Sequence, residues 1–117
     1  MIRFLALSVA FVSPALAQNP PSGATLYAPC KVCHSLDPSG KKGLGPPLDG
    51  VVGRKAGTVV GFTYSTAMKK SGKVWTPKLL DAYLADPRNT IPGNRMSYPG
   101  IKDPVKRAAL IKWLESQ

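Results

Sequence analysis

The sequence predicts one small all-α domain, with about three to five helices and a large share of loop. Two stretches carry apolar residues at helical spacing behind a proline-containing start signal, and no stretch alternates apolar and polar residues as a half-buried strand does. The 11 glycines and 12 prolines among the 117 residues favour turns between the helices. A chain of this size buries a modest core and often needs a disulfide, metal or cofactor for stability.

The first 17 residues have the pattern of a secretory signal peptide. A positive start is followed by an apolar run over residues 4–12 and by small residues before an expected cleavage between Ala17 and Gln18. A membrane anchor is the alternative, but the run is shorter than the roughly 20 residues that cross about 30 Å of hydrocarbon. We therefore expect a signal peptide over residues 1–17, a mature domain over residues 18–117 in the periplasm, and no stable membrane insertion.

The mature chain is strongly basic. Of the 16 lysines and arginines only Arg3 lies in the leader, which leaves 15 against 6 acidic residues and a formal charge of +9. Such a charge suits a solvated surface, nucleic acid, anionic lipid or an acidic protein partner. The secretory leader argues against nucleic acid, and the scattered lysines indicate a broad docking face rather than a basic tail.

The two clearest helices share a start signal. Thr76-Pro77 is an N-cap residue followed by proline at the first helical position, and Asp103-Pro104 repeats the pattern. We expect Asp86-Pro87 to end the first of these helices. Their apolar stripes consist of Leu79, Leu80, Tyr83 and Leu84 in the first, and of Val105, Ala109, Leu110, Trp113 and Leu114 in the second.

Shorter helices are expected over residues 23–28 and near residues 65–70. Pro29 should limit the first of them, because proline disfavours α geometry in the preceding Ala28. Residues 35–63 are rich in Gly, Pro and Lys and show little periodicity, which predicts a loop. A loop of this length is unusual inside a compact domain, and it becomes reasonable if it wraps something other than protein.

One motif carries the chemistry. Cys30-Lys31-Val32-Cys33-His34 is the C-x-x-C-H signature of c-type haem attachment, in which each thiol adds to one haem vinyl group and the histidine supplies an imidazole nitrogen to the iron. A redox dithiol would need a βαβ context, and a zinc site would need further Cys or His ligands. The chain has two cysteines and one histidine in all. We therefore expect one covalent haem c, with the long loops wrapped around it.

A second iron ligand must come from elsewhere in the chain, and the soft candidates are Met68 and Met96. Met96 lies in a stiff, irregular stretch rich in Pro and Gly, which suits a loop that aims a thioether at iron. Met68 lies in an expected short helix, and we interpret it as core filler. Ligation by His34 and Met96 favours reduced iron and leaves no open coordination position, which points to one-electron transfer rather than oxygen chemistry.

The chain resembles the mitochondrial type of class I cytochrome c, including its short bacterial relatives. The similarity covers roughly residues 23–114 and keeps the family spacing without a gap from His34 to Ile101. The motifs that carry it, besides Cys30 to His34, are Gly45-Pro46-Pro47-Leu48, Gly53-Arg54, Gly61-Phe62-Thr63-Tyr64-Ser65, Val74-Trp75, Tyr83-Leu84, Asp86-Pro87 and Ile91-Pro92-Gly93 before Met96.

The resemblance implies roles for five further residues. The Pro46 carbonyl would accept a hydrogen bond from the His34 ring. Tyr64 and Trp75 would hydrogen-bond a haem propionate, and Arg54 would offset propionate charge. Tyr83 would lie beside the Met96 sulfur. The alternatives are that Trp75 and Tyr83 are plain core aromatics and that Arg54 is solvated.

The chain also departs from the family pattern. Asn94 stands where the family usually has threonine, Met68 replaces a common asparagine near the haem, and Tyr98 replaces a phenylalanine at the haem edge. The first two positions help to order a buried water in relatives, so the reduction potential and the strength of the Met–iron bond are open. The N-terminal helix, shorter than usual and interrupted by Pro29, is expected to pack on the C-terminal helix at Trp113.

The leading functional hypothesis is a diffusible, monomeric one-electron carrier rather than an enzyme. Its partners would be acidic faces of redox proteins, such as quinol–cytochrome c reductase and a terminal oxidase or reaction centre. One alternative is a dedicated electron acceptor of a periplasmic dehydrogenase. A haem peroxidase or a gas-binding module is the other, and each of these would need an open or displaceable iron position. The sequence does not separate the candidate donors and acceptors.

Overall fold

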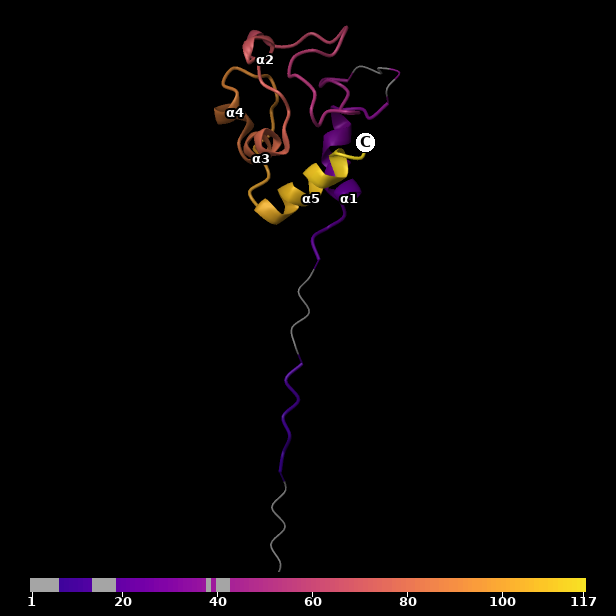
Figure 1. The fold of residues 1–117 in the computed structure, drawn as a ribbon, viewed down its shortest axis with the longest axis vertical. Helices are drawn as coiled ribbons and strands as arrows, with labels where there is room; N and C mark the ends of the chain where they lie inside the picture. Colours follow the sequence, from indigo (N-terminus) through magenta and orange to yellow (C-terminus); the bar gives the residue numbers. More distant parts are fainter. Residues whose placement is uncertain (1–6, 14–18, 38, 40–42) are drawn as a thin grey trace, which may run out of the picture.

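The structure is a computed structural model that describes residues 7–13, 19–37, 39 and 43–117 (Figure 1). Its elements in chain order are α1 (Gly23–Tyr27), the 3-10 helix η1 (Ala28–Val32), α2 (Thr66–Lys70), α3 (Pro77–Ala85), α4 (Pro87–Thr90) and α5 (Pro104–Leu114). Among the described residues, strand-like pairing is confined to one isolated antiparallel bridge, between Lys55 and Val74. The prediction of an all-α domain is confirmed.

Side-chain caps begin the helices where the sequence places its start signals. The Thr76 hydroxyl accepts from the Leu79 amide at 3.1 Å, and the Asp103 carboxylate accepts from the Val105 amide at 2.9 Å. Asp86 accepts from the Asn89 amide at 3.3 Å and begins α4. Asp86-Pro87 therefore ends one helix and starts another, so the expectation of a stop was incomplete. The same Asp-Pro pair that interrupts α3 supplies an N-cap and a first-turn proline to α4.

The α-helix α1 ends at Tyr27, before Pro29, as expected, but the expectation that Ala28 avoids α geometry is wrong. Ala28 has φ −50° and ψ −43°, which is right-handed helical geometry, and η1 continues to Val32. Pro29 occupies the first turn of η1, where its missing N–H is not needed for a helical hydrogen bond. This 3-10 turn carries Cys30 and leads directly into Cys33.

The first and last helices pack against each other. The rings of Tyr27 and Trp113 have centroids 5.1 Å apart, and Tyr27 is 1% exposed. Gly23 lies so close to α5 that an ideal Cβ would sit 2.1 Å from the Trp113 Cβ, so this crossing requires glycine. The expected contact of the N-terminal helix with Trp113 is present.

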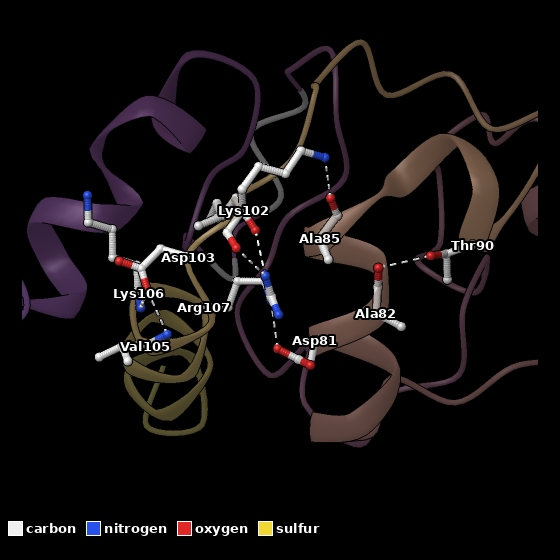
Figure 2. Close-up of polar contacts among 10 residues, drawn as sticks. Asp81, Ala82, Ala85, Thr90, Lys102, Asp103, Val105, Lys106 and Arg107 are labelled. Atoms are coloured by element: carbon white, nitrogen blue, oxygen red, sulfur yellow. Dashed lines mark hydrogen bonds and ion pairs between the residues drawn. The ribbon is translucent and has the colours of Figure 1, made fainter.

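Polar contacts join α5, α3 and the chain between them (Figure 2). The Arg107 guanidinium donates to Asp81 Oδ1 at 2.8 Å and to the Ile101 and Lys102 carbonyls at 2.8 and 3.2 Å. Lys102 Nζ donates to the Ala85 carbonyl at 2.8 Å. The stretch that follows Met96 is thus fixed to α3 at its C-terminal end.

The long loop has no helix or strand in its described residues, as predicted. It is held by backbone bonds to distant segments: Gly53 N–H donates to the Trp75 carbonyl at 2.8 Å, and Trp75 N–H donates to the Arg54 carbonyl at 2.9 Å. Its Val51 and Ala56 enter the apolar core. The other core members are Tyr27, Trp75, Leu80, Tyr83, Ile91, Leu110, Ile111 and Leu114.

The described part of the N-terminal stretch, residues 7–13, runs without helix or strand away from the helical part (Figure 1). Its apolar side chains are exposed, Phe11 to 94%. The expected cleavage site between Ala17 and Gln18 lies outside the described residues. In the part of the chain that the structure describes, no helix combines the length and apolar character that crossing a bilayer requires.

Candidate functional site

The motif residues occupy a single turn at the end of η1. The Cys30 carbonyl accepts from the Cys33 amide at 3.1 Å and from the His34 amide at 2.9 Å, which fixes the three residues relative to one another. Both thiols are free and half-buried. Burial raises the pKa of Cys30, so its sulfur stays a thiol at neutral pH. One turn therefore presents two reactive sulfurs and an imidazole together.

The His34 ring is held by the long loop. Its Nδ1 lies 2.8 Å from the Pro46 carbonyl oxygen, and because a carbonyl only accepts, Nδ1 carries the proton and Nε2 keeps a free lone pair. An ideal Cβ on Gly45 would lie 2.3 Å from His34 Cε1, so the main chain supports the ring directly. Burial is the largest influence on the His34 pKa and lowers it, and Arg54 lowers it further against the opposing effect of Pro46. The ring is therefore a neutral donor suited to a metal ion.

Met96 lies on a stretch that faces α3. The Tyr83 hydroxyl, on α3, is 3.9 Å from Met96 Sδ, so the pair expected from the sequence is brought together. Burial raises the pKa of Tyr83 to about 12, so this hydroxyl keeps its proton at neutral pH. Tyr83 also packs edge-on against Trp75, with ring centroids 4.8 Å apart. The other candidate, Met68, lies on α2, half-buried against the apolar core.

The residues present fit a haem. The donor set is one imidazole with its second nitrogen tied to a carbonyl, one thioether, and two thiols separated by two residues. An open hollow of about 410 Å³ is bounded by Cys33 and His34, and another of about 340 Å³ is bounded by Tyr98 and Ile101. Half-buried apolar side chains packed against the core could contact the apolar faces of a haem. They include Leu36, Leu48, Val52, Leu79 and Leu84.

The three residues expected near the propionates have protein partners of their own. Arg54 donates to the Pro47 carbonyl at 2.8 Å and to the Asp49 carbonyl at 3.1 Å. The Tyr64 hydroxyl accepts from the Val59 amide at 3.1 Å. Trp75 is buried beside Tyr83. Arg54 thus braces the loop just after the carbonyl that orients His34, a contribution that the sequence did not indicate.

Sequence reasoning also missed the part played by Asn94. Its side chain contacts Tyr83, the Met96 amide, and the carbonyls of Pro87 and Ile91. The signal available in the sequence was an amide two residues before Met96, at a position where the family usually has threonine. The convergence of four partners on it requires the folded chain.

Exposed basic and apolar side chains lie next to the candidate ligands in the sequence. Lys31, beside Cys30, is exposed, as is Arg95 next to Met96. Val32 and Leu44 are also exposed, to 81% and 86%. Exposed positive charge is typical of surfaces that dock transiently with acidic partners.

No family model matches the chain. Among curated proteins, it is 41% identical to cytochrome c2 of Rhodomicrobium vannielii, over 96% of this chain and 96% of that protein. It is 43% identical to cytochrome c2 of Blastochloris viridis, over 91% of this chain and 84% of that protein. It is 48% identical to cytochrome c2 iso-2 of Magnetospirillum fulvum, over 86% of this chain and 99% of that protein.

A solved structure gives the same result for the fold. Cytochrome cH from Methylobacterium extorquens superposes with a TM-score of 0.77 at 45% sequence identity. The match covers 81% of this chain and 95% of that one.

Proposed function

The chain belongs to the class I cytochromes c, one-electron carriers with one covalent haem c, and we propose that Cys30, Cys33, His34 and Met96 hold its haem. The observation that carries this assignment is the 2.8 Å contact between His34 Nδ1 and the Pro46 carbonyl. It leaves Nε2 as the free donor, in the same turn as both thiols. Met96 would supply the thioether.

The haem, when bound, gains and loses one electron at its iron. The protein keeps the two proposed iron ligands, His34 and Met96, in fixed positions during that change. Pro46 and Gly45 hold the His34 ring in one orientation. Tyr83 lies beside Met96 and is buried against Trp75, so the surroundings of the thioether are largely apolar. With His34 and Met96 both bound to the iron, no coordination position would stay open for oxygen or peroxide.

We further propose that Lys31, beside Cys30, together with Arg95 and Lys102, near Met96, steers the protein onto acidic faces of its redox partners. Quinol–cytochrome c reductase and a terminal oxidase or reaction centre are the expected partner types. Opposite charges speed the encounter, and the exposed apolar side chains of Val32 and Leu44 are available for a brief contact with the partner. The haem propionates we assign to the neighbourhood of Tyr64, Trp75 and Arg54.

We also propose that residues 1–17 are a signal peptide and that the mature domain, residues 18–117, works in the periplasm. The described apolar side chains of the leader are exposed rather than packed on the core, which suits a segment that is removed. Mass spectrometry of protein from a host with the cytochrome c maturation machinery should give residues 18–117 plus one haem.

The same preparation tests the covalent attachment. Haem should stay with the protein in acidified organic solvent, and Cys30→Ser or Cys33→Ser should each leave one thioether. Extraction of the haem from the wild-type protein would contradict the assignment of both cysteines. Assays against purified complexes should then find which one reduces the protein and which one reoxidises it, and a response to a single periplasmic dehydrogenase alone would contradict the shuttle.

A further inference from the structure

The side chain of Asn94 uses its full hydrogen-bonding capacity. Nδ2 donates to the Pro87 carbonyl at 2.8 Å and to the Ile91 carbonyl at 2.8 Å. Oδ1 accepts from the Met96 amide at 2.8 Å and lies 3.2 Å from the Tyr83 hydroxyl. A side-chain amide offers two donors and two acceptor lone pairs, so all four positions are filled. This one residue therefore connects α4, α3 and the backbone of Met96.

The orientation of the Asn94 amide follows from its partners. Reversing it would place the NH₂ group against the N–H of Met96 and the oxygen against the carbonyls of Pro87 and Ile91, so those three contacts would become repulsive. Oδ1 must therefore face Tyr83. Because Oδ1 carries no hydrogen, the Tyr83 hydroxyl is the donor in that contact.

Tyr83 has one hydroxyl proton and two possible acceptors for it. Asn94 Oδ1 lies at 3.2 Å, whereas Met96 Sδ lies at 3.9 Å. An amide oxygen is a much stronger acceptor than a thioether sulfur. The proton accordingly goes to Asn94, and the sulfur faces the lone pairs of the Tyr83 oxygen.

We propose that Asn94 is a positioning residue that fixes the Met96 backbone, withholds the Tyr83 proton from the Met96 sulfur, and so lowers the reduction potential. The inference rests on the proposed assignment of Met96 as an iron ligand. A sulfur that receives no hydrogen bond keeps its electron density for the iron. That density stabilises the oxidised state more than the reduced state, so the equilibrium shifts toward oxidation.

The first test uses the haem-loaded protein and the Tyr83→Phe variant. If the Tyr83 proton belongs to Asn94, removing the hydroxyl takes no hydrogen bond from the sulfur. We expect redox titration to show less than about a twofold change in the equilibrium constant for reduction. A larger shift toward oxidised iron, in the two- to tenfold range of one lost neutral hydrogen bond, would show that Tyr83 donates to Met96 and would overturn the proposal.

The second test adds Asn94→Ala and the double variant. Losing the amide frees the Tyr83 proton for the sulfur, so we expect Asn94→Ala to favour reduction by about two- to tenfold. The effect should disappear in the Tyr83→Phe background. Equal shifts in both backgrounds would mean that Asn94 acts through structure alone. Asn89→Ala is the matched control, because Asn89 is exposed and its side chain contacts Asp86.

The claim that Asn94 fixes the Met96 backbone is tested separately, by amide hydrogen exchange. The Met96 amide donates to Asn94, so its hydrogen exchange should be slow in the wild type and in Asn89→Ala, and at least tenfold faster in Asn94→Ala. Unchanged exchange would overturn this half. The Met–iron absorption band distinguishes a failure of the Met96 ligand assignment from a failure of the Asn94 inference. Its persistence in Met96→Ala would overturn the ligand assignment and this inference together, whereas a normal ligand with an uncoupled Asn94 would overturn the inference alone.

Discussion

The two proposed iron ligands, His34 and Met96, are held in different ways. On the His34 side the support is main chain, from the Pro46 carbonyl at 2.8 Å and the backbone of Gly45 pressed against the ring. On the Met96 side the support is side chain, from Asn94, which accepts from the Met96 amide and from the Tyr83 hydroxyl. A main-chain support changes little when side chains are exchanged, unless volume is added. A support made by a side chain changes when that residue is substituted. Substitutions at Asn94 should therefore adjust the reduction potential in small steps.

Removing the thioether itself should give the largest effect. Met96→Ala should abolish the Met–iron absorption band of the oxidised protein and lower the reduction potential, because a soft ligand that favours reduced iron is lost. Met68→Ala should leave the band intact. Visible spectra and redox titration check both. Loss of the band in Met68→Ala alone would mean that the methionine assignment is reversed.

The next largest effect should come from adding one methyl group on the His34 side. Gly45→Ala places a Cβ about where the imidazole lies, so we expect a loss of about 1–3 kcal/mol in the free energy of unfolding and an altered haem spectrum. Denaturant titration of the haem-loaded protein measures the first.

Gly50→Ala is the matched control for that substitution. Gly50 has a φ of +63° and open space around its Cβ position, so alanine there adds backbone strain without contact. We expect Gly50→Ala to cost about 1 kcal/mol and to leave the haem spectrum unchanged. A normal spectrum in Gly45→Ala would mean that the main chain does not press on the His34 ring.

Smaller effects should follow from removing the hydrogen bonds that Arg107 makes to Ile101 and Lys102, which follow Met96 in the chain. Arg107 is 13% exposed and binds two carbonyls as well as Asp81, so Arg107→Gln should cost about 1–3 kcal/mol. Asp81 is 50% exposed, so Asp81→Asn should cost less. We expect the Met–iron band of Arg107→Gln to disappear at a lower denaturant concentration than haem-ring spectral changes do. A single shared transition, as in a Lys112→Gln control, would contradict a local role.

The smallest effects concern the surface, where neither kind of support is touched. Lys31→Glu should slow electron transfer to a natural partner by a few-fold, more than Lys112→Glu on α5, since steering weakens with distance from the docking face. Lys102→Glu should also slow it, although that change additionally removes the bonds to the Ala85 and Pro99 carbonyls. Stopped-flow rates over a salt series measure the effect. A flat salt dependence, or equal effects of the three changes, would rule out docking at this face.

Features whose determinants lie within a few residues of one another could be predicted from the sequence, and features that depend on distant contacts could not. The helices α3 and α5 were predictable because N-cap, proline and apolar spacing lie within a few residues of one another. The helix α4 was missed because Asp86-Pro87 was interpreted only as a stop. The bracing by Arg54 and the four contacts of Asn94 depend on carbonyl groups that point in the right direction only in the folded chain. The sequence pattern alone therefore did not predict which main-chain carbonyls these side chains would reach.

The contact between Gly23 and Trp113 also bears on how the domain forms. It joins the first helix to the last, so the chain must close nearly its whole folded length before the contact exists. Helical proteins usually fold fast because their contacts are local, and this one gives up that advantage. The entropy lost in closing such a loop grows only with the logarithm of its length. The distant contact between α1 and α5 should therefore slow folding while costing little stability.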